Sequence, residues 1–219
     1  MASSNNIQKR DEKGKFQGYN FPKNATFLEK LRIISRQAGI NRFSSNAREW
    51  FRKRTQLLGG SPSRLLSEKG AKIEGHPFIG KMFFFQYDAK YKDTLPYWDA
   101  FPLIFPVDIT DDGFSGLNLH YLVPTVRAAF LDKLTSISNN KRYDVTTKIN
   151  LSYQLLKGST KFKEFLPCYH RYLNEHVKSS FVRVDANDWD TVIFLPFEQF
   201  QKAGNQKVWW DSNKKIRES

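Results

Sequence analysis

The chain has 219 residues, of which 40% are apolar, and this is enough for one large domain that buries its own core. It has 12 glycines and 9 prolines, and no apolar run approaches the roughly 18 residues of a membrane span, so collagen-like and membrane-spanning classes are excluded. The single cysteine excludes an internal disulfide, and the polar first residues lack the apolar stretch of a secretory signal. We therefore expect a reducing cytosol, or a particle assembled there.

The positive charge of the chain is concentrated in its N-terminal third. In total, 35 Lys and Arg stand against 22 Asp and Glu, a net charge of +13. Residues 1–75 contain 16 basic and 6 acidic residues, a net of +10, whereas residues 76–219 contain 19 and 16, a net of +3. Such clustering is typical of a protein that contacts a polyanion, most often nucleic acid, although a solubilising arm is the simpler alternative.

Apolar spacing predicts three helices after an N-terminal tail. Residues 1–20 are polar and charged, which indicates a disordered basic tail. Helices are expected over residues 25–38, 45–58 and 62–68, because apolar side chains recur at helical spacing between capping and stop signals. We interpret residues 21–75 as a basic helical arm.

Three aromatic and β-branched runs predict the strands of a body, over residues 81–88, 100–109 and 114–122. Asp111-Asp112-Gly113 predicts a hairpin turn between the second and the third run. The second run contains two prolines, which cannot donate ladder hydrogen bonds, so we expect it to break or bend there. The strands should form a small antiparallel β meander or a partly closed barrel.

Helices are expected to pack on this sheet. A helix over residues 124–138 should bury one side, formed by Val126, Ala129, Phe130, Leu134 and Ile137. The remaining elements are expected in this order: a strand or short helix over 144–156, a helix over 162–177, strands over 181–184 and 191–195, and a helical turn over 196–202. The predicted fold class is α+β, with a body over residues 76–205 and a basic C-terminal tail over 206–219.

Six aspartates in two expected turns are candidates for the metal site of a magnesium nuclease: Asp108, Asp111, Asp112, Asp185, Asp188 and Asp190. Asp is also preferred in turns because it bonds its own backbone, and we favour this interpretation. Cys168 and His170 would point about 200° apart on the expected helix, so they cannot act as a catalytic pair. We expect no enzyme activity, no metal, no cofactor and no small-molecule substrate.

The basic residues of the arm are the candidates for nucleic-acid binding. Guanidinium groups match phosphate oxygens, so a run of them can follow a nucleic-acid backbone without reading bases. The candidate residues are Lys9, Arg10, Lys13, Lys15, Arg42, Arg48, Arg52, Lys53 and Arg54. Near the C-terminus, Trp209 and Trp210 stand among lysines, where they could stack on bases, although docking onto the core is the simpler alternative.

Residues 81–134 contain several distinctive stretches, among them YDAK at 87–90, LPYWD at 95–99 and GLNLHYL at 116–122, followed by the helix VPTVRAAFLDKL. This pattern resembles the DNA end protector family of T-even-type tailed bacteriophages. The residues that carry the resemblance are Tyr87, Lys90, Tyr97, Asp99, Pro102, Asn118, His120 and Tyr121.

The resemblance implies a non-catalytic virion protein, assembled in the host bacterial cytoplasm, that binds the ends of the packaged double-stranded DNA and protects them from host exonuclease. Its implied partners are genomic DNA ends and other virion proteins at the portal, neck or tail, and no membrane. The alternative is a structural tail or neck protein, such as a head–tail connector or baseplate component, whose basic arm grips acidic neighbouring subunits instead of DNA.

Overall fold

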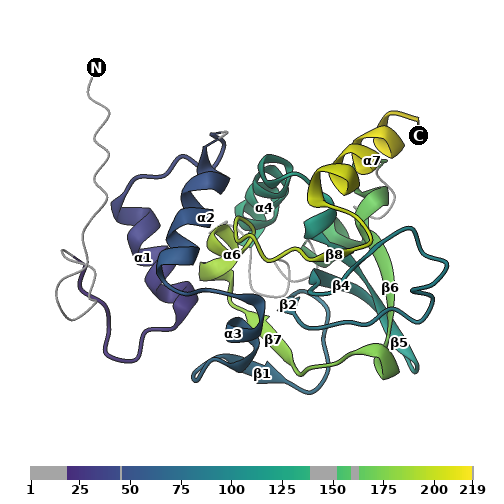
Figure 1. Ribbon diagram of the computed structural model, residues 1–219, viewed down its shortest axis with the longest axis horizontal. Coiled ribbons are helices and arrows are strands. Elements are labelled where there is room, and N and C mark those ends of the chain that lie inside the picture. Colours follow the sequence, from purple (N-terminus) through teal and green to yellow (C-terminus); the bar gives the residue numbers. More distant parts are fainter. Residues whose placement is uncertain (1–18, 45, 139–151, 159–162, 219) are drawn as a thin grey trace.

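The structure is a computed structural model that describes residues 19–44, 46–138, 152–158 and 163–218 (Figure 1). In these ranges it forms a mixed α+β protein in which helices pack around a six-stranded antiparallel sheet. The expected α+β class is confirmed. The sheet is open, so the partly closed barrel that we considered does not form.

Three helices precede the sheet, as expected: α1 (Phe27–Gln37), α2 (Ala47–Leu57) and α3 (Pro62–Ser67). Helix α1 begins with a capping residue, because the hydroxyl of Thr26 accepts a hydrogen bond from the amide of Glu29. Ser61 caps α3 in the same way, with proline at the first helical position. These helices do not project from the body, since Phe27, Leu31 and Phe51 lie in the main hydrophobic core.

The strands of the main sheet lie in the order β1-β7-β2-β4-β5-β6, and all neighbours are antiparallel. Their bounds are β1 Lys72–Glu74, β2 Met82–Phe84, β4 Leu103–Thr110, β5 Gly113–Asn118, β6 Tyr169–Leu173 and β7 Phe181–Val184. A second, two-stranded sheet pairs β3 (Trp98–Asp99) with β8 (Phe200–Gln201). The meander that we expected therefore forms its centre, and β6, β7 and β1 extend it.

Both faces of the sheet are buried, and this explains the continuous apolar runs. Along β2, Met82 and Phe84 face the main core under the helices, whereas Phe83 and Phe85 face a second, smaller core on the other side. Successive side chains of a strand point to opposite faces, so a strand covered on both sides is apolar at every position.

The expected hairpin is confirmed: Thr110 of β4 pairs with Gly113 of β5 across Asp111 and Asp112. The expected irregularity in the second run is confirmed as well. The register shifts between Pro106 and Asp108, because proline has no N–H to donate to the ladder.

Helix α4 (Pro124–Ser138) forms where we expected it, but the predicted buried face is partly wrong. Val126 and Ala129 are exposed, whereas Arg127 is fully buried together with Ala128, Phe130 and Leu134. The apolar pattern could not indicate this, because an arginine can occupy the core side of a helix only when its guanidinium group is fully bonded. Residues 139–151, on which part of the expected 144–156 element falls, lie outside the described ranges, and residues 152–158 are helical.

Three predictions for the C-terminal half are wrong. The helix expected over 162–177 is replaced by a 3-10 helix (Lys163–Cys168), strand β6 and a second 3-10 turn (Asn174–His176). Pro167 interrupts helical hydrogen bonding there, and β6 pairs with the edge of β5. The strand expected over 191–195 is instead the end of α6 (Ala186–Val192) with the turn that follows it. The helical turn expected over 196–202 is a loop that leads into β8.

The C-terminal residues form helix α7 (Asn205–Glu218), which packs against the 3-10 helices Leu119–Tyr121 and Lys163–Cys168 of the body. Cys168 is fully buried at the end of the 3-10 helix beside it. Burial raises the pKa of the Cys168 thiol well above its ordinary value, so this thiol stays protonated.

Candidate nucleic-acid interface

Two of the arginines that we proposed for nucleic-acid binding are ion-paired with the body of the protein itself. Arg48 of α2 donates to Glu198 over 2.7 Å and to the carbonyl of Leu195 over 3.2 Å. Arg42 pairs with Asp132 of α4 and with Asp190 of α6. Because their charges are balanced by carboxylates, these two arginines fasten the N-terminal helices to the body.

The other basic residues of α2 face solvent. Arg52 and Lys53 share the carboxylate of Glu49 on the same helix, and the Lys53 side chain is 67% exposed. Arg54 lies over the ring of Trp50. Exposed pairs of this kind contribute little to stability, so phosphate oxygens could compete for these cations. Lys9, Arg10, Lys13 and Lys15 lie outside the described ranges.

The two adjacent tryptophans of α7 have different environments. Trp209 is buried, and its Nε1 donates to the carbonyl of His120 over 2.9 Å. The guanidinium groups of Arg48 and Arg127 both lie over its ring. Trp209 is therefore part of the core and its proposed stacking role is not supported. Trp210 is 59% exposed between two lysines of the same helix.

Four of the six candidate aspartates bind cationic side chains, and Asp188 and Asp190 lie in helix α6 instead of the expected turn. Asp112, in the hairpin turn, accepts from Arg171, and Asp188 accepts from Arg32 over 2.8 Å. Within the described ranges, no three His, Cys, Asp or Glu side chains are placed to hold a metal ion. Asp112, Asp185, Asp188 and Asp190 thus take part in ion pairs between elements.

The residues that carry the family resemblance converge in space around Asp99. Its carboxylate accepts hydrogen bonds from His120 Nδ1 over 2.7 Å, from Asn118 Nδ2 over 3.1 Å and from the amides of Phe101 and Gln199. The amide oxygen of Asn118 in turn accepts from the His120 backbone. A buried carboxylate with four donors is fully satisfied, so this cluster fixes the loops that meet at β3.

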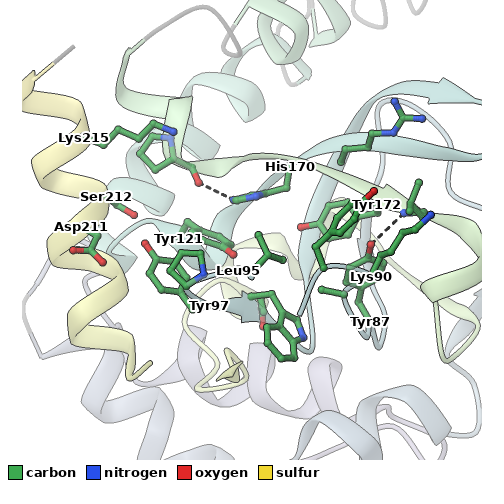
Figure 2. Close-up of a pocket in the computed structure, with 18 of the residues that line it drawn as sticks. Tyr87, Lys90, Leu95, Tyr97, Tyr121, His170, Tyr172, Asp211, Ser212 and Lys215 are labelled. Atoms are coloured by element: carbon green, nitrogen blue, oxygen red, sulfur yellow. Dashed lines mark hydrogen bonds between the residues drawn. The ribbon is translucent and has the colours of Figure 1, made fainter. Parts of the chain in front are cut away.

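A pocket of about 660 Å³ lies above this cluster (Figure 2). Tyr97 and Tyr121 form one wall next to α7, and Tyr87 and Tyr172 form the opposite wall. Its lining also includes Lys90, Tyr91, Leu95, Trp98, His170, Arg171, Asp211 and Lys215. Five of the eight residues that carry the resemblance line this pocket. Asn118 and His120 are buried and bind the carboxylate of Asp99, and Pro102 lies in the segment that follows Asp99.

Two polar side chains of the pocket walls, His170 and Tyr97, are uncharged near pH 7. Burial lowers the pKa of His170 to about 4, so its ring is neutral near pH 7, and Nε2 then donates to the carbonyl of Pro167 over 2.8 Å. Burial, reinforced by the neighbouring carboxylate of Asp211, raises the pKa of Tyr97 to about 12. Neutral aromatic rings therefore form the walls, the hydrogen-bonded carboxylate of Asp99 is buried between them, and the cations Lys90, Arg171 and Lys215 are exposed.

Several pocket residues could not be identified from the sequence alone. His170, Arg171 and Tyr172 lie on a segment that we expected to be helical, and in β6 they reach the pocket together. Lys215 belongs to the expected tail, which α7 brings over the pocket. Residues 169–173, Tyr-His-Arg-Tyr-Leu, show no apolar–polar alternation, so there is no periodic signal for this strand in the sequence.

A buried hydrogen-bond network connects the pocket with helix α2. Arg127 donates to the carbonyls of His120, Leu122 and Ile193 and to Glu198 Oε1 over 2.6 Å. Burial alone would raise the pKa of Glu198, but the charges of Arg127, His120 and Arg48 lower it to about 2. Since Glu198 also binds Arg48, one network holds the pocket and α2 in a fixed relation.

The described part of the chain is thus an α+β protein with an aromatic pocket and exposed cations. Residues 26–216 match the family described as the phage T4 terminal DNA protecting protein, so the chain belongs to that family. This confirms the resemblance seen in residues 81–134 and extends it over most of the chain. Members of the family are structural proteins that protect DNA ends, not enzymes, which agrees with our expectation. No curated protein and no solved structure matches the chain.

None of the helices in the described ranges has the length and apolar character needed to cross a bilayer.

Proposed function

We propose that this protein binds the ends of the packaged double-stranded DNA genome and shields them from host exonuclease without any chemistry of its own. The observation that carries this proposal is the family match over residues 26–216. In the particle, the protein would lie at the genome end near the portal vertex, in contact with portal, neck or tail proteins.

Contacts to the DNA backbone would supply most of the affinity. The net charge of +10 in residues 1–75 supports this, together with the exposed side chains of Arg52 and Lys53. Packaged ends need not share one sequence, so backbone contacts suit the task better than base reading. Arg42 and Arg48 contribute indirectly, because they hold α2 in place.

The test is exonuclease digestion of a linear duplex with and without the protein, at two salt concentrations, with circular DNA as competitor. We expect protection that weakens with salt and that an excess of circular DNA does not abolish. Equal competition by the circle would indicate general coating of DNA, and full digestion at both salt concentrations would contradict the proposal.

A further inference from the structure

We propose that the aromatic pocket binds the unpaired terminal nucleotide of a DNA strand. This inference rests on the proposed function and specifies how an end is distinguished from the interior of a duplex. A continuous duplex offers backbone everywhere, but only an end can release a base from its stack at little cost.

The size of the pocket suits one nucleotide. Its volume of about 660 Å³ lies within the range of 300–1,000 Å³ that is typical of small-ligand sites. A single base with its sugar and phosphate fits such a space, whereas a base pair inside a duplex cannot enter it. The pocket is open to solvent on the side of Tyr91, whose ring is 63% exposed.

The walls of the pocket suit a base. Tyr97 and Tyr121 lie on one side and Tyr87 and Tyr172 on the other, with Leu95 between the two groups in Figure 2. The ring of His170 packs on Tyr121 with centroids 4.1 Å apart and extends this aromatic surface. Flat rings bind bases by stacking whatever the sequence, because every base has a π face.

The rim of the pocket suits the attached phosphate. Lys90 lies at the end formed by Tyr87 and Tyr172 (Figure 2), and Arg171 precedes Tyr172 on β6. Their present partners are exposed carboxylates, Glu175 at 3.7 Å and Asp112 at 2.6 Å. Exposed pairs of this kind are weak, so a phosphate group can take over these two cations.

The lining also distinguishes a nucleotide from a peptide of a neighbouring virion protein. Grooves that bind amphipathic helices are lined mainly by aliphatic side chains, whereas tyrosine, tryptophan and histidine rings predominate here, with cations at the rim. Three cations, Lys90, Arg171 and Lys215, and three carboxylates, Asp99, Asp112 and Asp211, complete the lining. The fit to a nucleotide therefore rests on the aromatic rings for the base, with Lys90 and Arg171 as donors for the phosphate.

The test is photocrosslinking of the full-length protein to a duplex that carries 5-iododeoxyuridine in a one-nucleotide overhang or at an internal position. We expect the terminal probe to crosslink to the peptides that contain Tyr91, Tyr97 or His170, and the internal probe to give no crosslink there. Terminal crosslinks confined to other parts of the chain would overturn the inference.

A second measurement uses variants of Tyr91, whose side chain is exposed and outside the buried core, so that its removal leaves the core complete. Tyr91→Ala should weaken binding to the overhang duplex by about 5- to 100-fold, since it removes one stacking ring, and Tyr91→Phe should restore it. Binding to a duplex whose ends are closed by hairpins should not change. Tyr169→Ala is the matched control, because Tyr169 is an exposed tyrosine of β6 outside the pocket lining.

The outcomes separate this inference from the proposed function. If the wild-type protein leaves linear DNA open to exonuclease, the proposed function fails. If it protects ends while Tyr91→Ala binds the overhang duplex as tightly as wild type, only the pocket assignment fails. If Tyr91→Ala binds DNA normally but is no longer incorporated into particles, the pocket binds a protein instead of DNA. This outcome also overturns the inference.

Discussion

Arg127 and Glu198 form an ion pair with a separation of 2.6 Å, and both side chains are fully excluded from solvent. The second carboxylate oxygen of Glu198 binds Arg48, so one carboxylate connects α4 with α2. A buried ion pair is stable only when every donor and acceptor of its two groups is hydrogen-bonded. The remaining N–H groups of Arg127 donate to three backbone carbonyls, which meets this condition.

We expect Glu198→Gln to lower the free energy of unfolding by about 3–5 kcal/mol, because it leaves two arginines without their carboxylate, one of them fully buried. Urea denaturation of the DNA-free protein measures this change. Glu218→Gln is the control, since its pair with Lys214 is exposed and long at 3.8 Å. Equal stability of the two variants would contradict a structural role for the network.

Stability should fall in two pH ranges on acidification. The pKa of His170 is lowered to about 4, so the unfolded chain binds a proton first and stability decreases from pH 6.5 toward 4. The pKa of Glu198 is lowered to about 2, so its contribution is complete above pH 4.5 and is lost between pH 4.5 and 2, about 3 kcal/mol in all. Below pH 4.5, the melting temperature of Glu198→Gln should fall less steeply with decreasing pH than that of the wild type. Thermal unfolding at several pH values measures this difference.

Exchange of Arg52 and Lys53 for glutamine should weaken DNA binding without loss of stability. Each phosphate contact contributes about 0.9 to the slope of log affinity against log salt, so the double variant should have a slope that is less steep by about 2. Fluorescence anisotropy at several salt concentrations measures it. Lys81→Gln, an exposed substitution in front of β2, is the control.

Deletion of residues 1–18 tests the N-terminal cations. The buried core of the described chain begins at Ala25, so this deletion leaves the core complete, whereas removal of residues 1–60 would take Phe27, Leu31 and Phe51 out of it. Four candidate cations, Lys9, Arg10, Lys13 and Lys15, are lost, and we expect the salt slope to decrease by up to about 4. An unchanged slope would exclude them from DNA binding.

Gly113→Ala should destabilise the protein strongly, because a Cβ there would lie 2.1 Å from the carbonyl oxygen of Tyr172 on β6. The added methyl group would push β6 away from β5 and deform the wall of the pocket, at a cost of about 1–3 kcal/mol or more. Gly75→Ala is the control, since nothing lies within 4 Å of its Cβ position. Thermal unfolding of the two variants should differ clearly.

Local signals predicted the first two thirds of the fold well. Thr26, Ser61 and the Asp111-Asp112 turn act through neighbours in sequence, so their effect can be read from a single chain. The β6 segment was misjudged because its strand character comes from pairing with β5, more than fifty residues away in sequence, which no local pattern shows.

The candidate site could be predicted only in part, for a related reason. The resemblance grouped Tyr87, Tyr97 and Tyr121, and they line one pocket, but that pocket depends on elements far apart in the chain. Arg42 and Arg48 looked like a free basic surface because a sequence shows charges without their partners. Asp190 and Glu198, some 150 residues later, neutralise them.

The burial of Cys168 has a practical consequence for such experiments. As its thiol is enclosed and stays protonated, maleimide reagents would leave it unmodified in the folded protein. A cysteine introduced at the exposed Asn213 of α7, next to Ser212 of the pocket lining, would then carry a fluorophore at one defined position. Energy transfer from that dye to a labelled oligonucleotide would locate the DNA terminus relative to helix α7 in solution.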